Sequence, residues 1–224
     1  RICGTSRDTF TQEQMVRDIG TRSNSSIVVI NNQFLFKTHL GDYARYDGGI
    51  NVEILSTKIE GTIAATNLDR IDDVRAAAFD DGTGDQDYYA CETASGASTH
   101  NRVLVYDTFH RAWTKFVGIT CNTIWSYELG TFETALAFGD YSGFVSRYPN
   151  GDTDAGTAIS AFWQSGQWRV PDSPLRKVFR VAQLYVEQTG SDHLTFIHRL
   201  DFEASGTTSS IILAGSGALW DTAV

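Results

Sequence analysis

Two stretches of sixteen residues, 102 positions apart, follow the same pattern of residue types. They are "FLFKTHLGDYARYDGG" (Phe34 to Gly49) and "LAFGDYSGFVSRYPNG" (Leu136 to Gly151). Each contains an apolar run, a Gly-Asp-Tyr turn, an Arg-Tyr pair and a second turn with Gly. Such a pattern is typical of two antiparallel strands. A repeat at a fixed spacing indicates one supersecondary unit used several times, which constrains the fold more than any single motif.

A further hairpin is predicted roughly midway, in "VLVYDTFHRAWTKF" (Val103 to Phe116). Its position gives a loose repeat of about fifty residues, near the period of kelch-type propeller blades. In such a blade an aromatic residue packs between adjacent sheets, and an acidic residue accepts backbone hydrogen bonds in the tight turn. We therefore expect Tyr106, Asp107 and Trp113 to be packing residues.

Other short apolar or alternating runs, separated by Gly, Asn and Asp, predict an all-β fold of antiparallel hairpins. We expect a partial β-propeller of about fifty-residue blades over residues 1–159. About three blades fit this length, and a closed propeller needs at least four. More chain or other elements would therefore have to close the propeller. The clearest interruption is Leu55 to Asp72, where a short helix capped by Ser56, with Ile59 and Ile63 on one face, is an open alternative.

The character of the sequence changes near Ser160, and residues 160–224 are predicted to form a separate β-sheet or sandwich-like segment. In "LTFIHRLDFE" (Leu194 to Glu203) apolar and polar side chains largely alternate, as in a strand with one covered face. The stretches "AFWQSGQWRV" and "KVFRVAQLYVEQ" are its expected partner strands. The expected packing or subunit-contact anchors of this segment are Trp163, Trp168 and Phe202.

Charge and cysteine content narrow the functional classes. A net charge of −9 and a pI near 4.9 argue against a surface that grips nucleic acid, although an acidic wall would let a polyanion slide past it. No window approaches about 18 consecutive apolar residues, so no membrane span is expected. The cysteines Cys3, Cys91 and Cys121 are odd in number and far apart, so we expect buried free thiols in a protein made in a reducing cytoplasm.

The best candidate for a metal site is "NGDTDAG", where Asn150, Asp152 and Asp154 alternate like the oxygen ligands of calcium loops. The sixth position is not Gly and the twelfth is Ala161, so the loop is not an EF-hand. An Asx-rich turn is the simpler interpretation. The five histidines show no zinc-ligand spacing. We therefore expect no cofactor.

Carbohydrate chemistry is the main enzymatic alternative, because propellers often carry paired carboxylates for glycoside hydrolysis. The acidic residues here lie in predicted turns, and no sialidase-type box is present. Four aromatic residues could line a carbohydrate groove, although packing between blades is the simpler role. They are Trp125, Tyr127, Trp163 and Trp168. We expect a protein that is not an enzyme.

Taken in order, six segments from about Thr21 onward resemble the propeller-containing tail proteins of tailed bacteriophages. The most similar are the tail hub, nozzle and packaged-DNA-stabilising proteins of short-tailed phages. The segments are "SIVVINNQFLFKTHLGDYARYDGG", "ILSTKIEGTIAATN", "NRVLVYDTFHRAWTKF", "LAFGDYSGFVSRYPNGDTDAGTAISAFW", "RKVFRVAQLYVE" and "GALWDTAV". The two Gly-Asp-Tyr turns that lead into Arg-Tyr are among the most telling.

The resemblance implies a structural virion protein that forms a ring, expected to be a homo-hexamer, below the portal and adaptor. Such a ring seals or lines the channel for packaged DNA, without sequence-specific contacts and without a membrane. Expected partners are copies of the chain, the portal, the adaptor and other tail proteins, with assembly in the host cytoplasm and a final place in the virion tail. Two alternatives remain open: a carbohydrate-binding or carbohydrate-cleaving propeller for host-surface recognition, and a kelch-like scaffold.

Overall fold

The computed structural model describes residues 2–3, 5–12, 18–80, 85–130, 133–151, 153–154, 157–165, 193–199 and 206–212. Within these ranges the chain is mostly β-strand, in several antiparallel sheets with few helices. The predicted all-β class is therefore confirmed. The chain divides into two compact units, Arg1–Ser160 and Ala161–Val224. Among the helices in the described ranges, none has the length and apolar character that a membrane crossing requires.

The first sheet consists of β3 (Val28–Ile30), β4 (Gln33–Lys37), β5 (Tyr43–Tyr46) and β6 (Val52–Ile54), paired in chain order. Asn31 and Asn32 connect β3 to β4 with φ angles of 50° and 61°. Two consecutive residues in the left-handed region match a type I′ hairpin turn, and Asn tolerates that region better than most residues. The Asn-Asn pair thus explains why the chain reverses here.

The second sheet consists of β7 (Arg75–Asp80), β8 (Gln86–Glu92), β9 (Arg102–Asp107) and β10 (Ala112–Val117), also paired in chain order. The hairpin predicted between residues 103 and 116 is confirmed as β9 and β10, where Trp113 faces Tyr106 across the pair. The turn between them is closed by Asp107, whose Oδ1 accepts the backbone N–H of His110 at 2.7 Å. Asp is favoured in turns because its short side chain can accept such local hydrogen bonds.

The third sheet, in the part of the chain that the structure describes, consists of β11 (Thr123–Gly130), β12 (Glu133–Gly139) and β13 (Val145–Tyr148). The three sheets begin at Val28, Arg75 and Thr123, so their starts are 47 and 48 residues apart. The loose repeat of about fifty residues in the sequence therefore corresponds to successive antiparallel sheets.

The two sixteen-residue stretches form equivalent hairpins, β4–β5 in the first sheet and β12–β13 in the third. Phe34 faces Tyr46 in one hairpin, and Leu136 faces Tyr148 in the other. Each member of one pair lies 102 residues from its counterpart, so the strand register is the same. The sequence repeat is therefore also a structural repeat.

The loops of these two hairpins have the same backbone hydrogen bonds. The loops are Thr38 to Asp42 and Asp140 to Phe144. In each loop the N–H of the first residue donates to the carbonyl of the fifth, at 2.7 Å and 2.9 Å. The side-chain oxygen of the first residue accepts the N–H of the fifth, at 3.0 Å and 2.8 Å. The fourth residues, Gly41 and Gly143, have φ angles of 102° and 91°. The shared letters Gly-Asp-Tyr are not equivalent in space, because Asp42 ends its loop and Asp140 begins its loop.

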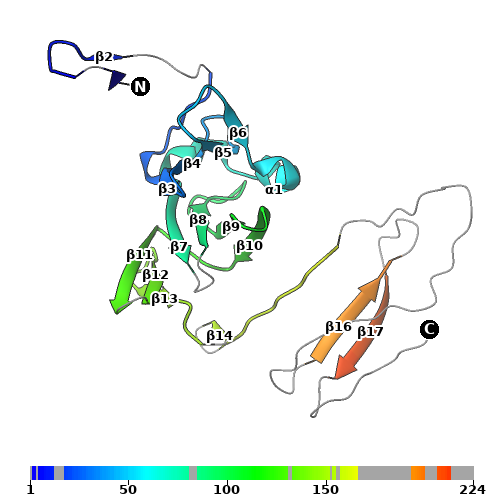
Figure 1. Ribbon diagram of the computed structural model, residues 1–224. Helices are drawn as coiled ribbons and strands as arrows, with labels where there is room; N and C mark the ends of the chain where they lie inside the picture. Colours follow the sequence, from blue (N-terminus) through cyan, green and yellow to red (C-terminus); the bar gives the residue numbers. More distant parts are fainter. Residues whose placement is uncertain are drawn as a thin grey trace, which may run out of the picture. The chain divides into compact units, whose positions relative to one another are not determined.

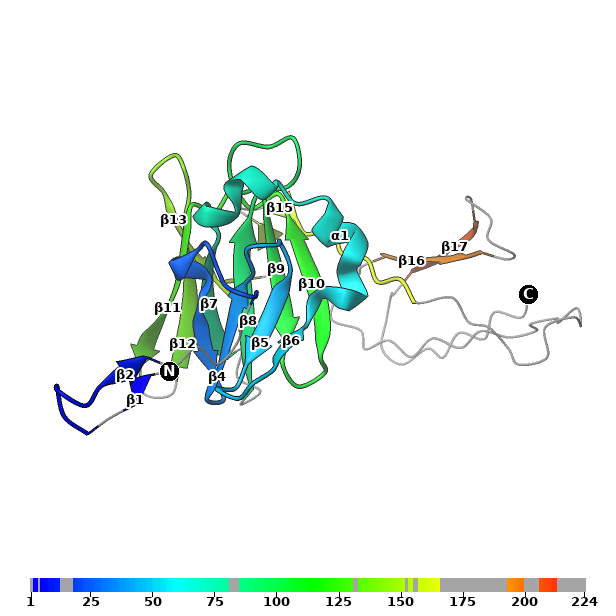
Figure 2. The ribbon, with the colours of Figure 1, turned by 90° about the horizontal axis from the view of Figure 1, so that it is seen from above.

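The second sheet packs against the other two through its opposite faces (Figures 1 and 2). Tyr88 and Ala90 of β8 belong to the apolar cluster shared with the first sheet. Tyr89 and Cys91 belong to the cluster shared with the third sheet. Because successive side chains of a strand point to opposite faces, a strand covered on both sides is apolar without alternation. This explains the uninterrupted burial from Tyr88 to Glu92.

Helical turns connect the first sheet to the second. A 3₁₀ turn at Ser56–Ile59 leads into α1 (Glu60–Ala64), and a second one spans Leu68–Asp73. A further 3₁₀ turn at Asn24–Ser26 precedes β3. The helix left open by the sequence is therefore present, with Ile59 and Ile63 packed on the core. Ser56 does not cap it, because its hydroxyl donates to Asp42 Oδ1 at 2.9 Å.

Shorter strands complete the described part of the chain. In the first unit β1 (Ile2–Cys3) pairs with β2 (Thr11–Gln12), and β14 (Thr153–Asp154) pairs with β15 (Thr157–Ala158). In the second unit β16 (His193–His198) pairs with β17 (Thr207–Ile212). All of these pairs are antiparallel.

The strand expected over residues 194–203 is formed in part. From Leu194 to His198 half-buried side chains alternate with exposed ones, as predicted for a strand with one covered face. The partner of β16 in the described residues is β17, which the sequence did not single out. Of the two expected partner stretches, residues 161–165 are described and are not a strand, and the rest lies outside the described residues.

The repeated loop yields a prediction about its two glycines. Replacing Gly41 or Gly143 with alanine places a Cβ at positive φ, which we expect to cost about 1 kcal/mol in either loop. At Gly41 the added Cβ would also lie 2.9 Å from Leu68 Cδ2, whereas nothing lies within 4 Å at Gly143. In urea denaturation Gly41→Ala should therefore lose more unfolding free energy than Gly143→Ala. Gly20→Ala, where φ is not positive, is the control, and equal losses for all three variants would contradict the loop geometry.

Candidate functional site

One buried carboxylate at the end of β8 is shared by two cations. Glu92 Oε2 lies 2.7 Å from Lys37 Nζ, and Glu92 Oε1 accepts a hydrogen bond from Arg102 Nε at 2.8 Å. The Tyr43 hydroxyl donates to Oε2 at 2.8 Å. The side chains of Lys37 and Glu92 are 0% exposed, and that of Arg102 is 7% exposed. These four residues are called the ionic junction.

The ionic junction joins the first sheet to the second at the ends of two hairpins. Lys37 and Tyr43 face each other across β4 and β5, and Glu92 and Arg102 face each other across β8 and β9. Lys37 Nζ also lies 4.1 Å from the centre of the Tyr43 ring, a cation–π distance. Each hairpin thus contributes one cross-strand pair, and the two pairs meet between the sheets.

Arg102 also donates hydrogen bonds to the helical connection. Its Nη2 donates to Thr66 Oγ1 at 2.8 Å and to the carbonyl of Thr62 at 3.1 Å. A buried charge is tolerated only when it is paired and hydrogen-bonded, and these contacts meet that condition. The junction therefore also holds α1, through Thr62, and the segment that follows it, through Thr66.

The ionic junction shifts the pKa values of its members. Burial by itself favours the protonated form of Glu92, but the two cations and the hydrogen bonds outweigh it and lower the pKa of Glu92 below 4.5. Burial lowers the pKa of Lys37, because the attraction of Glu92 does not fully offset it. Burial, assisted by the charge of Glu92, raises the pKa of Tyr43 well above 10.0. The Glu92 carboxylate is thus ionised, and the protonated Tyr43 hydroxyl donates a hydrogen bond to it.

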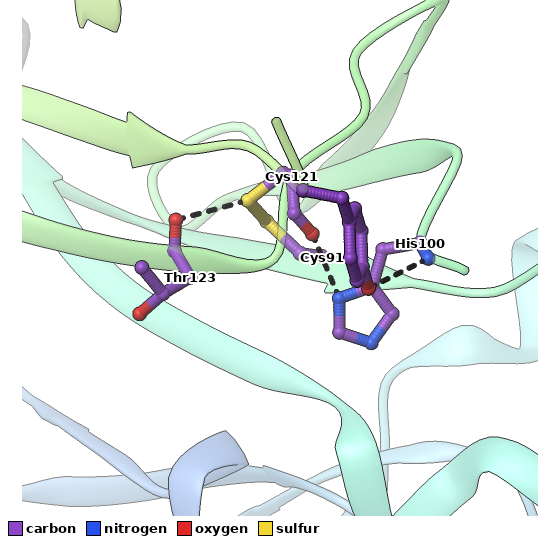
Figure 3. Close-up of a disulfide and its surroundings, with 5 residues drawn as sticks. Cys91, His100, Cys121 and Thr123 are labelled. Atoms are coloured by element: carbon purple, nitrogen blue, oxygen red, sulfur yellow. Dashed lines mark hydrogen bonds between the residues drawn. A yellow bond between two sulfur atoms is a disulfide. The ribbon is translucent and has the colours of Figure 1, made fainter. Parts of the chain in front are cut away.

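On the other face of β8, Cys91 forms a disulfide with Cys121, which lies just before β11 (Figure 3). The two Cα atoms are 6.2 Å apart, and the residues lie 30 positions apart in the sequence. The prediction of free thiols is therefore wrong for this pair. Stacking of the second and third sheets brings the two cysteines together, and no sequence spacing signals that contact. The pair is called the covalent junction.

His100 lies beside the covalent junction, in the loop between β8 and β9 (Figure 3). Its Nδ1 lies 2.8 Å from the carbonyl oxygen of Cys121, and its backbone N–H donates to the Tyr141 hydroxyl at 3.1 Å. The Nε2 atom is buried and has no hydrogen-bond partner among the described residues. Burial lowers the pKa of His100, so the neutral ring with Nδ1 as the donor fits the site. His100 thus adds a polar contact between the second and third sheets.

The side chains of both junctions are buried, so these residues hold neighbouring sheets together. In the residues that the structure describes, no group of three or more His, Cys, Asp and Glu side chains could hold a metal ion.

A polar pocket of about 200 Å³ lies on the first sheet, where Arg45 and Glu53 form an ion pair across β5 and β6. Its other lining residues are Gln33, Asp47, Asn51 and Val52.

The three predicted packing residues of the second sheet lie close together. The ring of Trp113 is 4.9 Å from that of Tyr106 and 5.1 Å from that of Tyr43, between centroids. Trp113 Nε1 donates to the carbonyl of Leu55 at 3.0 Å. Trp113 therefore packs between the first and second sheets, and Asp107 closes the turn beside it.

Few of the other predicted site residues can be placed. Asn150 is exposed after β13, whereas Asp152 lies outside the described residues and only the backbone of Asp154 is described. The calcium candidate therefore stays a prediction. Trp163 is 85% exposed, and Trp168 and Phe202 lie outside the described residues.

Sequence reasoning missed both junctions. Glu92 follows the run "YYAC" and Lys37 follows the run "FLF", so each is a charged residue directly after an apolar run. Opposite charges at such positions in neighbouring sheets are a usable signal, because a charge there needs a partner. The signal does not say which charges meet, since that depends on how the sheets stack.

The ionic junction predicts unequal effects of removing its charges. Glu92→Gln leaves two buried cations without a carboxylate and should cost about 3–5 kcal/mol of unfolding free energy. Lys37→Met should cost less, because Glu92 keeps its hydrogen bond to Arg102 and neither of these charges is left without a partner. The matched control is Glu53→Gln, because Glu53 is about half exposed and such pairs contribute about 0–1 kcal/mol. Similar losses for Glu92→Gln and Glu53→Gln in chemical denaturation would contradict a buried junction.

The lowered pKa of Glu92 predicts an acid dependence of stability. Below pH 4.5 the unfolded chain binds a proton at Glu92 before the folded chain does, so folding loses free energy as pH falls. The stability advantage of wild type over Glu92→Gln should be complete above that pH and shrink as pH drops through the lowered folded pKa. Denaturation curves at a series of pH values measure it. An advantage that is constant down to pH 2 would be the contrary result.

Comparison of the chain with protein-family models and with curated proteins gives no match. The functional interpretation therefore rests on the sequence pattern and on the arrangement of the sheets.

Proposed function

We propose that the chain is a structural protein of a bacteriophage tail, a hub or nozzle component that closes or lines the DNA channel below the portal and adaptor. Its sheets would be blades of a propeller, and copies of the protein would form a ring, expected to be a hexamer. The protein would assemble in the host cytoplasm and remain in the virion tail. The phage resemblance of the sequence suggests this role, and the sheet arrangement supports it.

The observation that carries the proposal is a central sheet covered on both faces by sheets of similar hairpin architecture. The outer faces of this stack are still apolar. Val29 and Phe34 face each other on the outer side of the first sheet, 55% and 43% exposed. Trp125 and Val145 lie on the outer side of the third sheet and are also exposed. In a propeller the next blade would cover each of these faces, as the first and third sheets cover the second.

The charge of the chain is compatible with a channel wall. A net charge of −9 repels a polyanion, so DNA could pass without sequence-specific contacts. The enclosed ionic and covalent junctions suit a part that keeps its shape under load, because they tie neighbouring sheets together. Trp163, with the exposed Phe162 beside it, is proposed as a contact to another subunit or tail protein.

A carbohydrate-binding or carbohydrate-cleaving propeller is the second candidate. It is favoured by Trp125 and Tyr127, which lie two residues apart on the outer face of β11 and are at least partly exposed. Aromatic faces of this kind stack on sugar rings. A glycan array separates the candidates: specific binding at about micromolar strength favours the sugar-binding protein, and background signal favours the conduit.

Electron microscopy of the native assembly tests the proposal. We expect an axial ring with DNA density passing through it, in complex with the portal and adaptor. A free monomer with a ligand in a central pocket would overturn it.

A pair of variants makes the same test residue-specific. Val145→Glu places a charge on the outer face of the third sheet, which the next blade of the propeller would have to bury. The propeller would then not close, and the assembly of subunits into the ring should fall at least tenfold. Phe109→Glu, in the turn between β9 and β10, is the matched control, since the two side chains are 65% and 70% exposed. Rings formed equally well by both variants would contradict the proposed blade contact.

A further inference from the structure

We infer that Cys91 and Cys121 form a reversible, redox-controlled staple that sets how firmly the third sheet is held on the second. The protein would keep its fold in both the dithiol and the disulfide state. This inference concerns the purified chain itself and does not depend on the proposed tail function.

The first observation is that the environment suits both redox states. Both cysteines are fully buried in the cluster formed by the second and third sheets, with Leu136 and Val103 among their neighbours. A thiol behaves as a small apolar group and is accommodated in such a cluster. Cys121 Sγ also lies 3.2 Å from the carbonyl oxygen of Thr123, which would accept a hydrogen bond from the reduced thiol (Figure 3).

The second observation is that the two interfaces of the second sheet are held differently. The ionic junction ties it to the first sheet, through Lys37, Glu92 and Arg102. Toward the third sheet the described contacts are apolar packing, the disulfide and a few hydrogen bonds. His100 bonds to Cys121 and Tyr141, and the Thr134 hydroxyl donates to the carbonyl of Asp80. Breaking the disulfide therefore loosens the third sheet and leaves the first interface in place.

The third observation concerns access to the sulfur atoms. His100 bonds to the Cys121 carbonyl and, through its backbone, to Tyr141, whose side chain is partly exposed. The β8–β9 loop and the β12–β13 loop thus meet beside the disulfide. A reductant would reach the buried sulfur atoms when this loop contact opens, so reduction under native conditions should be slow.

The chemistry is ordinary thiol–disulfide exchange with a dithiol reductant. A thiolate of the reductant attacks one sulfur, the Cys91–Cys121 bond breaks, and a mixed disulfide forms. The second thiolate of the reductant then releases the second cysteine and closes the reductant's own disulfide. Two electrons and two protons pass to the protein, which ends with two thiols. A small-molecule disulfide reverses the reaction.

Native-state hydrogen exchange with and without dithiothreitol tests the staple. On reduction we expect amide exchange in β11, β12 and β13 to rise about a hundredfold, because the closed loop of 30 positions no longer limits their opening. Exchange in β3 to β6 should stay within about twofold. Alkylation before reduction should label Cys3 and leave Cys91 and Cys121 unlabelled.

Two variants make the experiment specific. Cys91→Ala combined with Cys121→Ala should exchange like the reduced wild type and should not respond to dithiothreitol, whereas Cys3→Ser should behave like wild type. The inference is overturned if exchange in the third sheet is unchanged by reduction, if the first sheet opens equally, or if Cys91 and Cys121 are alkylated without reductant. Wild type under reduction gives the answer even if the double variant does not fold.

Discussion

A carboxylate buried between two sheets is the constraint on which the first unit depends. Glu92 is fully enclosed, and a charge in that position is stable only because Lys37, Arg102 and Tyr43 contact it. These partners come from β4, β5 and β9, so the first and second sheets must stack in one register for the charge to be satisfied. We infer that this requirement selects one stacking register, because sliding of the sheets would separate Glu92 from its cations.

The neighbouring residue extends this constraint to the other side of the sheet. Cys91 and Glu92 are consecutive in β8, and because strand side chains alternate they reach opposite faces. One face is tied by charge and the other by a covalent bond. The end of β8 is therefore the point where the three sheets are fixed to one another. This arrangement is compatible with the proposed role as a rigid wall.

Local patterns predicted much of this fold and little of the site. The hairpin of Tyr106 and Trp113 could be read from its strand and turn residues, because those preferences act over a few positions. The spacing of 102 residues between the two similar stretches also matches the spacing of equivalent strand positions. The two Gly-Asp-Tyr triplets, however, occupy different positions in their loops. The junctions could not be predicted, since Lys37 and Glu92, or Cys91 and Cys121, meet only after separate hairpins stack. Nothing local encodes which strand ends become neighbours.

A double-mutant cycle between Lys37 and Glu92 tests the central claim most directly. Chemical denaturation of wild type, Lys37→Met, Glu92→Gln and the double variant gives the coupling free energy of the two side chains. If the first and second sheets stack through this ion pair, the coupling should be about 2 kcal/mol and favourable. A coupling below about 0.5 kcal/mol would mean that the two residues do not meet, and the stack would have to be arranged differently.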